Sequence, residues 1–169
     1  ADGRLFGIMR EPTPGLLLGE SLDDEPMSLA KALEIVQPLV QGLAACHAAG
    51  VLHRNLNPHN VLVAGHGAVL RGFGFPPVIG WARPSVRASN LGYTAPELLR
   101  EGVATAASDV YSLAALCYRL LTGRAPLGAV PPAHDRNREL DPRVDPLLRR
   151  ALHPLPSERP SLGELGEGL

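Results

Sequence analysis

The chain has 169 residues, 45% of them apolar, which is enough to bury the core of one domain and too little for two full ones. Its formal net charge is −1 and no block of five or more Lys and Arg residues occurs, so neither a nucleic-acid footprint nor a polybasic membrane patch is indicated. Cys46 and Cys117 supply neither a disulfide framework nor a four-ligand metal set. No apolar run approaches the roughly 20 residues that span a bilayer, and we expect a cytoplasmic domain, either alone or as the cytoplasmic part of a larger or membrane-tethered protein.

The first part of the chain predicts a short strand followed by one long helix. Residues 4–10, RLFGIMR, are typical of a strand, and the prolines and glycine of EPTPG end it. After a connector that reaches Met27, apolar residues recur at helical spacing, with Ser28 as the N-cap and Gly50 beyond the last turn. This pattern predicts a long amphipathic helix that is kinked or loosened at Pro38.

The middle of the chain predicts a β-hairpin and a long irregular segment. Two short apolar runs, 61–63 and 68–70, flank AGHG, which is typical of a hairpin with a glycine-containing turn. The polar loop HRNLNPHN, residues 53–60, leads directly into the first of these runs. Residues 74–92 contain three prolines and no sustained periodicity, and we expect an irregular segment there.

The last third of the chain predicts helices only. Short helical patterns occur at 96–100, 142–152 and 161–169, and a connector rich in Pro and Gly covers 125–133. The segment that begins at Ser108, SDVYSLAALCYRLLTG, is apolar on nearly every face, which predicts a helix buried in the middle of the domain. The sequence therefore predicts a mainly helical fold with a small hairpin and no internal repeat.

Several motifs occur in a fixed order: HRxLxPxN, an xFG triplet, GYTAPELL, SDVYSLAALCYRLLTGRAPL and a late ERPS. In this order they resemble the C-terminal lobe of the eukaryotic-type Ser/Thr protein kinases, including their bacterial relatives. The resemblance implies a kinase-like C-lobe over residues 16–169. It also implies that residues 1–15 are the last strand and the hinge of an N-lobe that is otherwise absent.

The resemblance implies structural roles for residues that the chain keeps. Glu97 is expected to pair with Arg159 and so tie the irregular segment to the last helices. Asp109 is expected to hold the backbone of the HRN loop from the start of the buried helix. His53 is expected to be a packed core histidine rather than a base.

Arg54, Phe73 and Gly74 are also kept for structure, according to the resemblance. In kinases the arginine at the position of Arg54 commonly meets a phosphorylated residue of the irregular segment, a charge-assisted pairing. The candidates for such a phosphate are three hydroxyl residues: Ser85, Ser89 and Thr94. The alternative is an arginine that bonds loop carbonyls.

The chemical positions differ from those of the kinases. The family's loop carries an Asp that orients the substrate hydroxyl, a Lys two residues later, and an Asn that holds Mg²⁺. Here Asn55 and Asn57 occupy the first two positions, and only Asn60 is kept. Gly72 stands where the main Mg²⁺-binding Asp begins the triplet, and Asn90 stands where a Thr usually bridges the catalytic Asp and Lys.

These four degenerate positions lead to the hypothesis that the chain is a pseudokinase and not an enzyme. Phosphoryl transfer depends on positioning and on charge neutralisation through the metal, so the loss of a carboxylate ligand is severe. We expect no catalytic residue, no metal site and no binding of ATP with Mg²⁺, with Asn60 as a vestigial nucleotide or metal ligand. The alternative is nucleotide binding, or an unconventional phosphotransfer that needs a missing N-lobe or a partner.

The expected partners are proteins. The hypothesis is a signalling module that acts by protein–protein interaction or as a scaffold. Without an N-lobe, an apolar surface near Ile8, Met9, Val61 and Val63 needs a cover, and exposed patches of this kind usually mark an interface. We therefore expect a protein partner or self-association at that surface, and no nucleic acid or membrane insertion.

Overall fold

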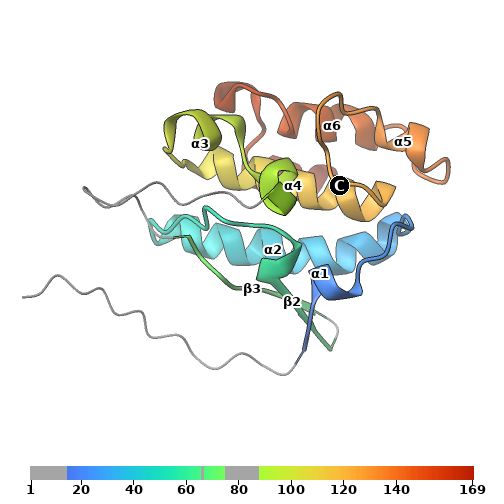
Figure 1. Cartoon of the computed structure of the whole chain (residues 1–169), viewed down its shortest axis with the longest axis horizontal. Coiled ribbons are helices and arrows are strands. Elements are labelled where there is room, and N and C mark those ends of the chain that lie inside the picture. The colour runs from blue at the N-terminus through green and yellow to red at the C-terminus, as the bar shows by residue number, and fades with distance from the viewer. Residues whose placement is uncertain (1–14, 66, 75–87) are drawn as a thin grey trace, which may run out of the picture.

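The computed structural model describes residues 15–65, 67–74 and 88–169. The expected strand at 4–10, the hinge that follows it, and Ile8, Met9 and Ser85 lie outside these residues. The described residues form a mainly helical protein with a small antiparallel sheet (Figure 1), so the predicted fold class is confirmed at this level.

The buried helix α4, Ala106–Thr122, is the centre of the fold. Its side chains are apolar on nearly every face, so it packs against α2, Leu29–Ala48, on one side and against α6, Val144–Ala151, on the other (Figure 1). A capping box between Thr105 and Ser108 begins the helix. Gly123 ends it with φ of 72°, and a Cβ there would also collide with the backbone carbonyl of Asp24.

Helix α2 confirms the predicted amphipathic helix. The Ser28 side chain caps it by accepting a hydrogen bond from the Lys31 backbone N–H at 3.4 Å. The helix continues on both sides of Pro38, so this proline does not interrupt it. Its buried residues occur three or four positions apart and face the core: Ala32, Ile35, Val36, Leu39 and Leu43.

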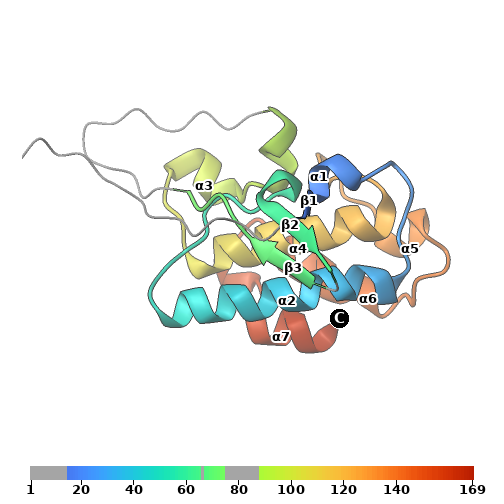
Figure 2. The same cartoon turned by 90° about the horizontal axis from the view of Figure 1, so that it is seen from below.

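The predicted hairpin is confirmed as β2, Val61–Ala64, and β3, Gly67–Leu70. A two-residue strand that the sequence pattern did not indicate, β1 (Leu16–Leu17), pairs antiparallel with β2 and completes a three-stranded sheet in the order β1-β2-β3. The sheet lies over α2, against which β3 packs (Figure 2). The HRNLNPHN loop therefore leaves α2 and enters the middle strand of this sheet.

The C-terminal helices confirm the predicted ones to within two residues at most ends. They are α3 (Pro96–Glu101), α6 and α7 (Leu162–Gly168), the last of which begins with a capping box from Ser161. Two four-residue helices were not predicted: α1 (Leu18–Ser21) lies within the connector that reaches Met27, and α5 (Ala133–Arg136) begins at the last residue of the connector 125–133. Three short 3-10 helices complete the fold: η1 (Pro58–Asn60), η2 (Ala88–Tyr93) and η3 (Pro156–Glu158).

Val61 and Val63 do not form an exposed apolar surface at the hairpin, although Val69 of β3 is 49% exposed. Val61 is fully buried in the main hydrophobic core, and Val63 is half-buried and packs against the same core. The reason is that the sheet lies against α2, so the side chains on that face are covered. In the described part of the chain, no helix has the length and apolar character needed to cross a membrane.

Candidate functional site

The HRNLNPHN loop is held at its start by a buried carboxylate. Asp109, in the first turn of α4, accepts hydrogen bonds from the backbone N–H groups of His53 and Arg54, both at 2.8 Å. The His47 ring lies 2.9 Å from the same carboxylate. Arg54 has φ of 64°, a left-handed conformation that is unfavourable for a residue with a side chain. Asp109 therefore holds the loop backbone in a conformation that it would not adopt alone.

His53 is a packed neutral imidazole in this structure. It is fully buried, its ring centroid lies 4.4 Å from that of Phe73, and its Nδ1 accepts a hydrogen bond from the Asn55 N–H at 3.3 Å. Burial lowers the pKa of His53, although the nearby Asp109 charge opposes this shift. The Gly74 N–H donates to the His53 carbonyl oxygen at 2.8 Å, which joins the triplet to the loop.

The asparagines of the loop form one hydrogen-bonded group. The amide nitrogens of Asn57 and Asn60 both donate to the Asn55 carbonyl oxygen at 2.8 Å, and the Asn55 amide donates to the Gly72 carbonyl oxygen at 3.1 Å. Gly72 has φ of 67°, and a Cβ at this position would lie 2.6 Å from Cγ of Asn60. The position of the Asn60 side chain therefore requires a glycine at position 72.

These side chains line a cavity of about 360 Å³ between the loop and η2. The lining residues are Asn55, Asn57, His59, Asn60, Ser89 and Asn90. Three of the four degenerate positions therefore contribute a side chain to the cavity, and Gly72 contributes a carbonyl oxygen to the network behind it. Among the described residues, no group of three or more His, Cys, Asp and Glu side chains gathers in a way that would hold a metal ion.

The sequence pattern assigns no function to His59, and the residue is exposed in the structure. The structure places it in the cavity wall, directly before Asn60. Its ring lies against α1, where Gly19 leaves room for it, because a Cβ at position 19 would be 2.6 Å from Nδ1. The contact depends on α1, which the sequence pattern did not reveal.

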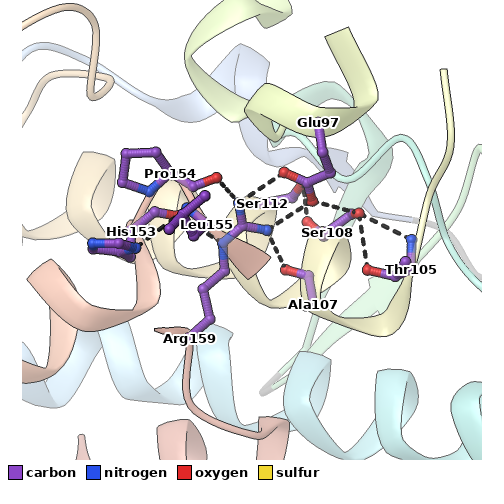
Figure 3. Close-up of polar contacts among 9 residues, drawn as sticks. All are labelled: Glu97, Thr105, Ala107, Ser108, Ser112, His153, Pro154, Leu155 and Arg159. Carbon is purple, nitrogen blue, oxygen red and sulfur yellow. Dashed lines mark hydrogen bonds and ion pairs between the residues drawn. The ribbon is translucent and has the colours of Figure 1, made fainter. Parts of the chain in front are cut away.

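A second buried carboxylate, Glu97, joins α3 to Arg159 in the last part of the chain (Figure 3). Glu97 forms a bidentate ion pair with Arg159, with nitrogen–oxygen distances of 2.8 and 2.7 Å, and accepts from the Ser108 hydroxyl at 2.7 Å. Arg159 uses its remaining donors on three carbonyl oxygens, those of Ala107, His153 and Pro154. Every N–H group of the guanidinium is thus satisfied.

The surroundings of Glu97 keep it ionised. Burial by itself raises the pKa of this carboxyl, but the hydrogen bonds from Arg159 and Ser108 outweigh burial and hold the pKa below its usual range. The pair is therefore a true buried ion pair, of the kind whose disruption leaves an uncompensated charge.

Two further expectations concern residues near the cavity. The Arg54 side chain makes no hydrogen bond to any described residue, so the alternative in which it bonds loop carbonyls is not seen within the described chain. The Thr94 hydroxyl donates to the Asn90 carbonyl oxygen at 2.9 Å, and the Ser89 hydroxyl donates to the Asn90 side chain at 3.3 Å.

The arrangement of these elements is that of a protein kinase. The protein kinase domain family matches residues 6–167, and the chain belongs to this family. A fold comparison agrees: the crystal structure of the Mycobacterium tuberculosis PknI kinase domain, a double mutant, superposes with a TM-score of 0.75 and 26% identity. That match covers 94% of this chain and 62% of the PknI chain.

Particular relatives are bacterial serine/threonine-protein kinases. PknL of Mycobacterium tuberculosis is 38% identical over 130 residues, which cover 74% of this chain and 33% of PknL. PkaB of Streptomyces coelicolor is 33% identical over 159 residues, which cover 86% of this chain and 38% of PkaB. The chain spans about a third of the length of these curated relatives.

The comparisons contradict the prediction that the chain is not an enzyme. Its family is that of the protein kinases, and the relatives are named as serine/threonine-protein kinases. Asparagine at positions 55 and 57 and glycine at position 72 are therefore differences within an enzyme family, and they do not by themselves remove the chain from it.

The anchoring role of Asp109 predicts a local effect of Asp109→Asn. The new NH₂ group would face backbone N–H donors, and an unsatisfied buried donor costs about 1–3 kcal/mol. We expect the amides of His53 and Arg54 to exchange with solvent about tenfold faster or more, as measured by NMR hydrogen exchange. Asp145→Asn, on α6, is the control and should leave both amides unchanged. Unchanged exchange in Asp109→Asn would contradict the anchoring role.

The Glu97–Arg159 pair predicts a loss of stability that depends on pH. Glu97→Gln leaves Arg159 buried without its counter-charge and should cost about 3–5 kcal/mol at pH 7. Because the pKa of Glu97 is lowered by folding, its contribution is complete above the unfolded pKa of about 4.3 and is lost as the pH falls through the folded pKa.

Urea unfolding at pH 7 and pH 3 should therefore show a large difference between the parent chain and Glu97→Gln that narrows in acid. Glu158→Gln removes an exposed carboxylate next to Arg159 and should change stability by less than about 0.5 kcal/mol. An equal loss at both pH values would show that Glu97 does not act through its charge.

Proposed function

We propose that the chain is the C-terminal lobe of a kinase-family signalling protein, and that it acts by binding a segment of a protein partner across the cavity. The observation that carries this proposal is the cavity itself, lined by hydrogen-bonding side chains on two segments far apart in sequence, η1 and η2. The motif order and the match to 62% of a solved kinase domain support the assignment of the lobe.

An apolar surface adjoins the rim of the cavity. Leu91, in η2 directly after Asn90, is 42% exposed, and Leu127 is 61% exposed. Leu127 lies near this turn, because a Cβ built on Gly92 would be 3.3 Å from Cγ of Leu127. An extended segment can therefore place a polar side chain in the cavity and a neighbouring apolar side chain on these two leucines.

Partner binding predicts a dependence on Leu127. Burying a leucine contributes about 1.5–3 kcal/mol, so Leu127→Asp should weaken the binding of peptides about tenfold or more. A degenerate array of peptides with a central Ser or Thr should select an apolar residue beside it, and fluorescence anisotropy on the selected peptides measures the affinity.

The matched control is Leu155→Asp, which places the same charge on another exposed leucine, 53% exposed and adjacent to η3. This variant should bind the selected peptides as the parent chain does. If no peptide binds, or if both variants bind equally well, the proposed function is wrong.

A second candidate function is nucleotide binding, or phosphotransfer, with an N-lobe supplied by the parent polypeptide or by a partner. Two observations favour it: Asn60, the retained position of the loop, lines the cavity, and Phe73 of the triplet packs on His53. In kinases the corresponding asparagine holds one Mg²⁺ next to the phosphates. If both functions hold, the nucleotide and the partner segment bind at adjoining sites on the same lobe.

The second candidate predicts a thermal shift with nucleotide. ATP at about 100 times its dissociation constant, with Mg²⁺ or Mn²⁺ and an added N-lobe, should stabilise the lobe by about 2.7 kcal/mol, which raises Tm by several degrees. Asn60→Ala should abolish the shift and any transfer of labelled phosphate to a generic substrate. The absence of a shift under every combination of metal and N-lobe would exclude this function.

A further inference from the structure

The cavity between the loop and η2 differs from the catalytic site of a kinase in the charges of its lining side chains. Six described residues line it: five carry neutral amides or hydroxyls, and the sixth is His59. None of these six described residues carries a carboxylate. A site lined by carboxylates repels a phosphate unless a metal ion lies between them, and a site without carboxylates imposes no such requirement.

Hydrogen-bond donors on the two sides of the cavity are not used by the described chain. The amides of Asn57 and Asn60 donate within the loop. The His59 ring and the amide nitrogen of Asn90, by contrast, donate to no atom of the described residues. His59 belongs to η1 and Asn90 to η2, so the available donors come from two different segments of the cavity lining.

We propose that this cavity binds a phosphate monoester directly, without a metal ion, and that His59 and Asn90 are the residues that bind it. The imidazole N–H and the side-chain amide each donate a hydrogen bond to a phosphate oxygen. The inference rests on the proposed function: the phosphate is carried by a phosphorylated Ser or Thr of the partner segment. A nucleotide phosphate shares the same chemistry and is the other source.

The fold holds both binding residues in place before a ligand arrives. The loop that carries His59 is anchored to α4 through Asp109, and η2 leads into α3, which Glu97 ties to Ser108 in the same turn of α4. The ligand therefore need not order either wall, and ordering is the usual cost of binding at a mobile site.

The binding test uses the full chain in a buffer that contains EDTA. Four probes are titrated by calorimetry: inorganic phosphate, N-acetyl-O-phosphoserine amide, N-acetylserine amide, and ADP. We expect the phosphoserine probe to bind at least tenfold more tightly than the serine probe, and added Mg²⁺ to leave its affinity unchanged. If metal-free ADP binds more tightly than the phosphoserine probe, the phosphate chemistry is supported and its source is a nucleotide.

Two variants test the residues. Asn90→Asp keeps the size of the side chain and the acceptor used by Ser89, but it places a carboxylate in the wall, and it should weaken phosphoserine binding about tenfold or more. His59→Gln replaces the ring N–H by a more flexible amide donor and should also weaken binding. The control is His153→Gln, the same substitution at a histidine that lines a separate pocket beside α6, and it should not change phosphoserine binding. Circular dichroism melts show whether each variant is folded.

Three results would overturn the inference. These are equal affinity for the phosphoserine and serine probes, binding that appears only with Mg²⁺, and unchanged binding in folded Asn90→Asp. If phosphate binding fails while peptides still bind in a way that depends on Leu127, only this inference falls. If the peptides also fail to bind, the proposed function falls with it.

Discussion

The hydrogen bonds to the Asp109 carboxylate are the interaction on which the rest of the structure depends. An ionised carboxylate taken out of water is expensive unless its oxygens are bonded, and Asp109 meets this condition with the His53 and Arg54 N–H groups and the His47 ring. These partners come from α2 and from the loop after it. One buried charge at the start of α4 therefore fixes where the chain turns from its longest helix into the sheet.

Ser108, next to Asp109 in the same turn of α4, holds α3, the helix that follows η2. Ser108 donates to Glu97, and Glu97 pairs with Arg159 from near the end of the chain. Adjacent residues, Ser108 and Asp109, thus anchor two segments that meet only in the folded protein. The buried charges of Glu97 and Arg159 are paired with each other, whereas the described residues that line the cavity are neutral side chains and one histidine.

The buried polar contacts that hold the fold and the side chains that line the cavity are different residues. The chain can therefore keep the fold of its family while its cavity residues differ. The protein kinase fold is retained through buried hydrogen bonds whose loss would unfold part of the protein. The cavity side chains hydrogen-bond within the loop, as Asn55 does with Gly72 and Asn57, and they take no part in the buried ion pair of Glu97 and Arg159. The hydrogen-bond donors and the charges of the cavity side chains therefore determine which ligand the cavity binds.

The sequence by itself determined the elements that have a period or turn residues: the helix after Ser28, the hairpin at 61–70 and the buried helix, which it predicted from Ser108. The motif order also indicated the pairing of Glu97 with Arg159 and the role of Asp109. Only the tertiary structure decided the strand β1, the short helices α1 and α5, the burial of Val61 and the place of His59 in the cavity wall. Elements of two to four residues have no detectable period, and a side chain's burial depends on partners distant in sequence, here α2 for the sheet and α1 for His59.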